Sequence, residues 1–168
     1  MKKQKNLILD NNQVKQKIKR IAYQILENNF DEKELLLAGI WLQGYKVAEL
    51  LKNELEEIAN FSIQLLKIEL DKESPKQSEI HLDEEEELLR DKVIIIVDDV
   101  SNTGRTMAFC LKPFLNNTVK KIETASLVNR SHTTFPISCT YTGYELSTTI
   151  NNHVEVKITN NNVNVFLS

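Results

Sequence analysis

Two adjacent carboxylates, those of Asp98 and Asp99, follow an uninterrupted run of apolar β-branched residues from Val93 to Val97. Such a run is typical of a central strand in a parallel sheet, buried on both faces. Two like charges side by side repel one another and are costly to bury, so they need hydroxyl donors or a cation. In open α/β sheets, ligands bind outside the carboxyl ends of the strands. We therefore expect the two carboxylates to belong to a ligand site.

The short polar segment from Ser101 to Thr106 complements these carboxylates. It leads into a predicted helix, and backbone N–H groups at such a position can hold an anion. Gly104 lets the backbone approach a ligand closely. Further side-chain donors stand at Ser101, Asn102, Thr103 and Thr106. Acceptors for a diol beside donors for a phosphate fit a ribose 5-phosphate. The structural alternative is that the carboxylates only cap the turn and that Thr103-Gly104 begins a helix.

Other phosphate motifs and several classes of protein are excluded. The chain has neither the GxxxxGK[ST] spacing of a Walker A loop nor GxGxxG. With 168 residues and a net charge of -3, it suits one domain of ordinary size without a generally basic surface. No apolar run reaches the roughly 18 residues of a membrane span, and the first apolar stretch is too short for a signal peptide. Cys110 and Cys139 lack metal-ligand spacing, which favours reduced cysteines in a cytoplasmic protein.

Strands and helices are predicted to alternate along most of the chain. Hydrophobic periodicity predicts helices over 12–28, 47–58 and 104–115, the last disturbed by Pro113, and strands over 35–40, 61–65, 93–97 and 122–128. Two alternating segments, 154–158 and 163–167, flank a turn at 159–162. This order predicts an α/β fold, with a central parallel sheet flanked by helices and antiparallel strands at the end. The polar excursion over 71–90 has the length of an active-site lid.

VIIIVDDVSNTGRT, from Val93 to Thr106, resembles the signature of type I phosphoribosyltransferases that binds 5-phosphoribosyl 1-pyrophosphate (PRPP). The resemblance extends over nearly the whole chain, through LILDNNQVKQKIKRIAYQILENN, LLLAGIWLQGYKVAELL, SLVNRSHTTFPISCTYTGYEL and HVEVKI. These segments resemble the bifunctional family of pyrimidine-operon attenuators and uracil phosphoribosyltransferases. The resemblance implies one phosphoribosyltransferase domain over 1–168. Its central parallel sheet would carry a flexible lid over about 69–92 and a small C-terminal β hood over about 129–168.

The resemblance also implies an activity and the residues that carry it. The implied enzyme transfers 5-phosphoribose from PRPP to a nucleobase, uracil first, and releases pyrophosphate. Asp98 and Asp99 would be the catalytic pair that holds the ribose hydroxyls, with Mg²⁺ bound alongside through PRPP. A dimer or tetramer of identical chains is implied as well. The implied PRPP contacts are Asp98, Asp99, Ser101, Asn102, Thr103, Gly104, Arg105 and Thr106; the pyrophosphate loop is Leu42, Gln43 and Gly44; the residues near the base are Val128, Asn129, Arg130 and His132.

Four segments depart from the family pattern. The pyrophosphate loop, usually Thr-Arg-Gly, is Leu42-Gln43-Gly44 and so lacks the positive charge of the arginine. Lys46 is close enough in sequence to supply that charge instead. The lid usually carries an aromatic-Arg-Asp-Asp stretch, and the corresponding segment here, residues 69–74, is Glu-Leu-Asp-Lys-Glu-Ser. The hood motif, usually Asp-Arg-Gly-His, reads Asn129 to His132, and the residue before Thr-Gly, often aromatic, is Asn102.

Three alternatives stay open. LQGYK, at 42–46, is also similar to the Lys-Gly-Gly-Tyr loop of purine salvage enzymes, which favours hypoxanthine or guanine as the base. A regulator of pyrimidine expression would bind RNA, but RNA binding needs a concentrated positive surface, and we interpret the basic residues over 15–20 as a solvated helix face. A sensor would bind PRPP without turnover, as the changed Gln43 and lid suggest. His81 and His153 are expected at the surface.

Overall fold

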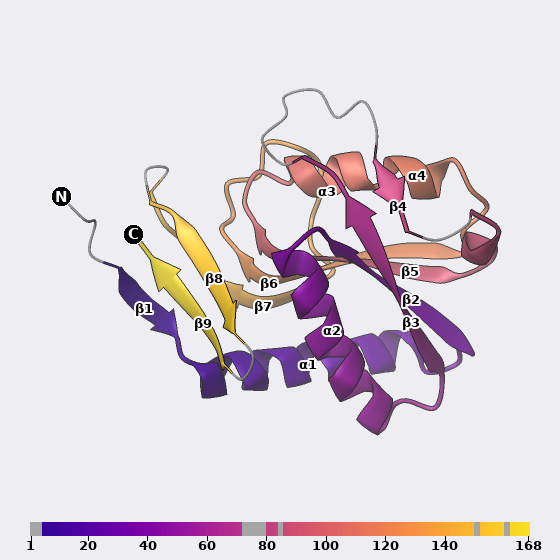
Figure 1. Cartoon of the computed structure of the whole chain (residues 1–168), viewed down its shortest axis with the longest axis horizontal. Coiled ribbons are helices and arrows are strands. Elements are labelled where there is room, and N and C mark those ends of the chain that lie inside the picture. Colours follow the sequence, from indigo (N-terminus) through magenta and orange to yellow (C-terminus); the bar gives the residue numbers. More distant parts are fainter. Residues whose placement is uncertain (1–4, 72–79, 84–85, 150–151, 160–161) are drawn as a thin grey trace.

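The structure, a computed structural model, describes residues 5–71, 80–83, 86–149, 152–159 and 162–168, and this part forms two sheets (Figure 1). The larger sheet has the order β4-β3-β2-β5-β6-β7, with every neighbour parallel except β4. The smaller antiparallel sheet has the order β1-β9-β8. The predicted α/β architecture with a central parallel sheet is confirmed. The strands are β1 (Asn6–Leu9), β2 (Glu34–Ile40), β3 (Ser62–Glu69), β4 (His81–Leu82), β5 (Val93–Ser101), β6 (Lys121–Asn129), β7 (Tyr141–Glu145), β8 (Val154–Thr159) and β9 (Asn162–Leu167).

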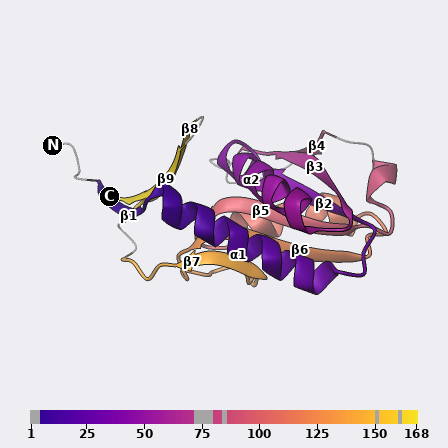
Figure 2. The same ribbon diagram turned by 90° about the horizontal axis from the view of Figure 1, so that it is seen from below.

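Helices cover both faces of the large sheet. On one face lie α1 (Asn11–Asn29), which starts with a capping box between Asp10 and Gln13, and α2 (Gln43–Ile58). Figure 2 shows α1 running along the sheet beside β6 and β7. The other face carries α3 (Arg105–Cys110) and α4 (Lys112–Leu115). The predicted helix over 104–115 is thus two short helices, because Pro113 lacks the N–H that would continue α3. Among the described residues, no helix is both long and apolar enough to cross a membrane.

The central strand explains the apolar run that precedes the two carboxylates. Successive strand side chains point to opposite faces, so Ile95 packs with α1 and α2 while Ile94 and Ile96 pack with α3 and α4. The strand continues past its predicted end at Val97, because β6 pairs with it as far as Ser101. The carboxylates therefore extend from a fixed strand.

The smaller sheet joins the two ends of the described chain. Strand β1, which sequence reasoning missed, pairs with β9, so its four residues are ordered by a partner from the far end of the sequence. The predicted strands over 154–158 and 163–167 are confirmed as β8 and β9. The expected hood range of 129–168 also contains β7, which pairs with β6 in the large sheet.

The expected lid over 69–92 is described only in part, since residues 72–79 and 84–85 lie outside the described residues. Its described portion contains β4, which pairs with β3, and a short 3-10 helix (Glu86–Leu89). Leu89 is fully buried against the face that carries α3 and α4. This portion therefore contributes to the core.

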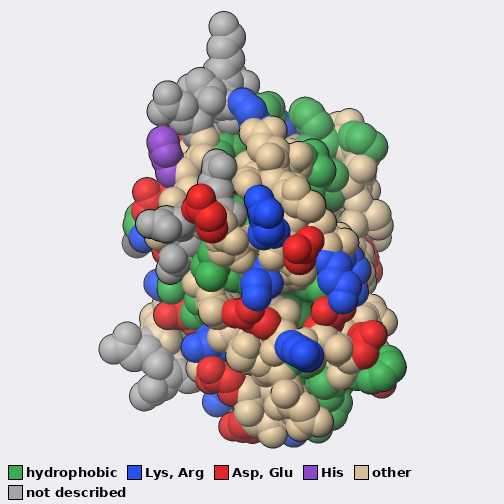
Figure 3. Space-filling model, turned by 90° about the vertical axis from the view of Figure 1, so that its right-hand side faces the viewer, with side chains coloured by type: hydrophobic (Ala, Val, Ile, Leu, Met, Phe, Trp, Pro, Cys, Tyr) green, Lys and Arg blue, Asp and Glu red, His purple; other side chains and the backbone are tan. Residues whose placement is uncertain are grey.

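The face at the amino ends of the parallel strands carries interspersed acidic and basic side chains (Figure 3). Lys120 on this side pairs with Glu32 at 2.7 Å, and Lys92 at the start of β5 pairs with Glu34 at the start of β2. Ion pairs that remain accessible to solvent contribute little to stability. Their mixed signs do not form a concentrated basic surface there.

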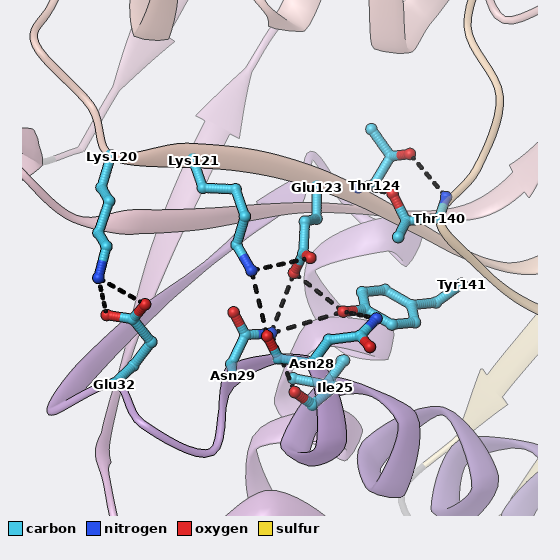
Figure 4. Close-up of polar contacts among 10 residues, drawn as sticks. All are labelled: Ile25, Asn28, Asn29, Glu32, Lys120, Lys121, Glu123, Thr124, Thr140 and Tyr141. Atoms are coloured by element: carbon cyan, nitrogen blue, oxygen red, sulfur yellow. Dashed lines mark hydrogen bonds and ion pairs between the residues drawn. The ribbon is translucent and has the colours of Figure 1, made fainter.

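A buried polar cluster fixes the end of α1 to β6 and β7 (Figure 4). The Glu123 carboxylate accepts hydrogen bonds from the Tyr141 hydroxyl at 2.9 Å and the Asn29 amide at 3.1 Å, and it pairs with Lys121 at 3.1 Å. Burial raises the pKa of the Tyr141 hydroxyl, so Tyr141 remains a neutral donor. The cluster satisfies a carboxylate that would otherwise be costly to bury.

Replacement of Tyr141 by Phe should destabilise the fold. The change keeps the ring but removes a donor from a buried carboxylate, so the free energy of unfolding should fall by roughly 1–3 kcal/mol at pH 7. The raised pKa of Tyr141 favours the folded state fully below the unfolded pKa of about 10, and this contribution is lost as the pH rises further. Urea unfolding at several pH values should thus show a difference that shrinks above about pH 10. Equal stability of both proteins at pH 7 would contradict this account.

Candidate functional site

The two carboxylates lie on opposite sides of β5. Asp98 is 2% exposed and lines a cavity of 110 Å³, whereas Asp99 is half-buried and lines a pocket of 340 Å³. An oxygen of Asp98 accepts a hydrogen bond from the backbone N–H of Asp99 at 2.9 Å. The two hollows are adjacent, because Val100 and Asn102 line both of them.

The predicted polar loop forms the wall of the smaller cavity. Gly104 has φ of +78°, and a Cβ there would lie 3.3 Å from the carbonyl oxygen of Phe135. The Thr103 carbonyl accepts hydrogen bonds from the N–H groups of Thr134 and Phe135, both at 3.0 Å, so the segment after β6 holds the loop. The cavity is lined by Asp98, Val100, Ser101, Asn102, Thr103, Gly104, Arg105, Thr106 and Met107. The structure therefore brings together every residue predicted for the loop.

The start of α2 packs directly against the end of β5. A Cβ on Gly44 would lie 2.7 Å from the carbonyl oxygen of Val97 and 3.1 Å from Asp98 Oδ1, so only glycine fits without a shift. Leu42 has φ of +58°, a strained conformation for a residue with a Cβ. The side-chain oxygen of Gln43 is buried and accepts no hydrogen bond from the described residues. The tight loop thus delivers Gln43 to the pocket beside Asp99.

The larger pocket lies between the carboxyl end of β5 and the small sheet, which face each other in Figure 1. One wall contains Gln43, Asp99, Val100, Asn102 and Arg130, and the other contains the five residues from His153 to Lys157. A depression of 840 Å³ lies elsewhere, between α1, α2 and the β8–β9 end. We place the candidate site at the 340 Å³ pocket and the adjoining 110 Å³ cavity, because the two carboxylates and the polar loop meet there.

Of the four residues expected near the base, only one lines this pocket. Arg130 lines it, is 5% exposed, and donates hydrogen bonds to the Thr148 hydroxyl at 2.8 Å and the Thr149 carbonyl at 3.0 Å. Val128 is buried in the core, and neither Asn129 nor His132 is among the residues that line the pocket. The lining thus includes one of the four predicted residues.

His153 and strand β8, which begins at the next residue, supply site residues that sequence reasoning missed. His153 is exposed, as expected, but it lies on the wall of the pocket with Glu155 and Lys157. The alternation of Val154, Val156 and Ile158 predicts this strand, but nothing in it indicates that the strand faces Asp99. That placement depends on how the small sheet packs against the large one.

Comparison with known proteins assigns the family. Residues 4–160 match the phosphoribosyl transferase domain. A protein of Haemophilus ducreyi named bifunctional protein PyrR is 31% identical over 158 residues, which cover 90% of this chain and 88% of that protein. The protein of the same name in Staphylococcus carnosus is 32% identical over 164 residues, which cover 90% of this chain and 91% of that protein.

Solved structures share the fold at low identity. The hypoxanthine phosphoribosyltransferase of Trypanosoma cruzi has a TM-score of 0.75 at 15% identity, over 89% of this chain and 84% of that one. A hypoxanthine-guanine phosphoribosyltransferase from Bacillus anthracis has a TM-score of 0.70 at 18% identity, over 84% and 82%. The chain therefore has the predicted fold and belongs to the type I phosphoribosyltransferase family.

Proposed function

We propose that this protein is a pentosyltransferase that transfers 5-phosphoribose from PRPP to uracil and releases pyrophosphate. The observation that carries the proposal is the junction of two hollows at the end of β5, one with Asp98 and the polar loop, the other with Asp99 and Gln43. In this proposal Asp98 and Asp99 hold the ribose hydroxyls. The 5-phosphate lies against Ser101, Asn102, Thr103, Gly104, Arg105 and Thr106.

The carboxylates of Asp98 and Asp99 fit Mg²⁺ as a partner of PRPP. Mg²⁺ prefers oxygen ligands and usually retains several waters or substrate oxygens. Asp98 and Asp99 offer carboxylate oxygens, and the described residues gather no cluster of three or more His, Cys, Asp or Glu for a metal. We therefore assign Mg²⁺ to these carboxylates jointly with the pyrophosphate of PRPP, whose leaving charge it would neutralise.

The protein residues act mainly by positioning and electrostatics. Displacement of pyrophosphate builds positive charge on the sugar carbon, and fixed carboxylates favour that charge. The loop at 101–106 and the pyrophosphate loop at 42–44 fix the two ends of PRPP, so the base meets a reactive carbon already in place. The wall formed by β8 and a lid over about 69–92 would exclude water from the reaction.

Uracil is supported by the resemblance of the chain to the bifunctional family and by relatives named bifunctional protein PyrR. The loop at 42–46 supports hypoxanthine or guanine as the alternative base. Assembly into a homodimer or homotetramer remains part of the proposal.

A second candidate function is a regulator or sensor that binds PRPP or a nucleotide but turns over weakly. Gln43 favours it, because this side chain is uncharged at the proposed pyrophosphate loop. The basic face of α1 does not favour RNA binding, because two of its basic side chains contact the protein itself. Its Arg20 donates to the carbonyls of Thr142 and Gly143, and Lys17 lies 5.9 Å from the centre of the Tyr144 ring.

Pyrophosphate release from Mg-PRPP tests the two functions. The assay should be run with uracil, orotate, hypoxanthine, guanine, xanthine and adenine, with PRPP affinity measured separately. Release with uracil alone supports the proposal, and release with another base corrects the substrate. PRPP binding with no release for any base would favour the sensor.

Replacement of Gln43 by Arg should increase turnover, because it places a cation beside the leaving pyrophosphate. We expect the rate of pyrophosphate release to rise by about tenfold or more, as for one added charge-assisted hydrogen bond. Gln43→Lys is the matched variant with the same charge and without the planar guanidinium. An unchanged or lower rate in both variants would show that no cation is missing at this position.

A further inference from the structure

The turn that follows β6 contains a residue in a strained conformation. Ser131 has φ of +57°, in the left-handed region that favours glycine. A residue with a Cβ remains in this region only where the surrounding contacts hold it there. The contacts that hold Ser131 come from Glu145, an exposed residue at the end of β7.

The Glu145 carboxylate accepts hydrogen bonds from both sides of this turn. One oxygen accepts from the Ser131 hydroxyl at 3.0 Å, and the other accepts from the side-chain amide of Asn129 at 3.1 Å. The amide oxygen of Asn129 accepts in turn from the backbone N–H of Ser131 at 3.3 Å. Hydrogen bonds to a carboxylate are stronger than those between neutral groups. Glu145 therefore fixes the residues on either side of position 130.

Arg130, the middle residue of the turn, is the one that reaches the candidate site. Its buried side chain lines the 340 Å³ pocket and donates to the Thr148 hydroxyl and the Thr149 carbonyl. Its backbone N–H donates to the carbonyl of Ser101 at 2.9 Å. Residue 130 thus joins the end of β5 to the segment after β7, and its place depends on the turn that carries it.

We propose that Glu145 is a positioning residue for phosphoribosyl transfer, because it holds Ser131 in its strained conformation and thereby keeps Arg130 at the wall of the pocket. This inference rests on the proposed function. Glu145 itself is not among the residues that line either hollow, so it acts through Arg130 and not by contact with a substrate. The same bond to Glu145 explains why Asn129, expected near the base, lies outside the pocket lining.

Variants at two positions test this role by steady-state kinetics of pyrophosphate release. Glu145→Ala removes both acceptors, so the KM for the nucleobase should rise by about 3- to 10-fold while the KM for PRPP stays unchanged. Glu145→Gln should keep a low KM, because its amide can accept from Asn129 and donate to the Ser131 hydroxyl. Glycine adopts a positive φ without strain, so Ser131→Gly combined with Glu145→Ala should restore the KM for the base.

A second measurement follows Arg130 without any substrate. Its Nε–H donates to the Thr148 hydroxyl at 3.1 Å, and its NMR signal can be assigned among only four arginines by Arg130→Lys. Exchange of this proton with water should be faster in Glu145→Ala and slow again when Ser131→Gly is added.

The matched control is Glu56→Ala, which removes an exposed carboxylate from α2 and should change neither the KM for the base nor the exchange rate. An effect of Glu145→Ala that Ser131→Gly does not reverse, or no effect on either measurement, overturns the inference. If the unsubstituted protein releases no pyrophosphate with any base, the proposed function fails instead. The exchange rate of the Arg130 proton then still decides whether Glu145 holds the turn.

Discussion

Replacement of both Asp98 and Asp99 by Asn should abolish binding of Mg-PRPP. The variant keeps nearly the same side-chain size but removes two negative charges from the end of β5, where the proposed site holds the ribose hydroxyls and Mg²⁺. Loss of two charged hydrogen-bonding groups should weaken binding by about 100-fold or more. Calorimetric titration with PRPP in the presence of Mg²⁺ measures the effect directly.

The matched control is Asp91→Asn, just before the other end of the same strand. Asp91 has φ of +58°, a conformation that asparagine also adopts readily, and it lies far from the carboxyl end of β5. Its PRPP affinity should equal that of the unsubstituted protein. Equal PRPP affinity of the double variant and this control would contradict the assignment of the site.

Replacement of Gly44 by Ala should impair both the fold and the site. The new Cβ would lie 2.7 Å from the carbonyl oxygen of Val97 and 3.0 Å from the Cα of Asp98, so the start of α2 or the end of β5 must move. Overpacking of this kind typically costs roughly 1–3 kcal/mol in the free energy of unfolding. Because the clash lies against Asp98 and beside the loop at 42–44, either movement disturbs the proposed site, and affinity for Mg-PRPP should fall by about tenfold or more even where the variant is folded.

Gly143→Ala separates the two effects. A Cβ on Gly143 would lie 2.5 Å from the carbonyl oxygen of Leu127, so this variant is also overpacked, but its clash lies between β6 and β7. It should lose stability without losing PRPP affinity, as measured by urea unfolding and calorimetry under conditions where both variants are folded. A parallel loss of affinity in both variants would show that the Gly44 effect is only one of stability.

Much of the fold was predictable because its signals are local. The apolar run at 93–97, the helical spacing over 12–28 and the alternation at 154–158 each depend on neighbours in the sequence, and each predicts an element that the structure contains. Strand β1 escaped prediction because four residues carry little pattern and β9 orders them from the far end of the chain. The extension of β5 to Ser101 escaped for the same reason, since β6 stabilises it.

The candidate site also combines residues that local sequence patterns predict with contacts that form only on folding. The chemistry could be predicted from residue types and spacing, because two carboxylates, a polar loop with Gly104 and a glycine at position 44 each lie within a short segment. The residues that lie opposite these segments could not be predicted, because they come from distant parts of the chain. Packing places β8 across the pocket from Asp99 and brings Arg130 to Thr148 and Thr149. Such contacts join residues far apart in sequence, and they arise when the two sheets bury their apolar faces together.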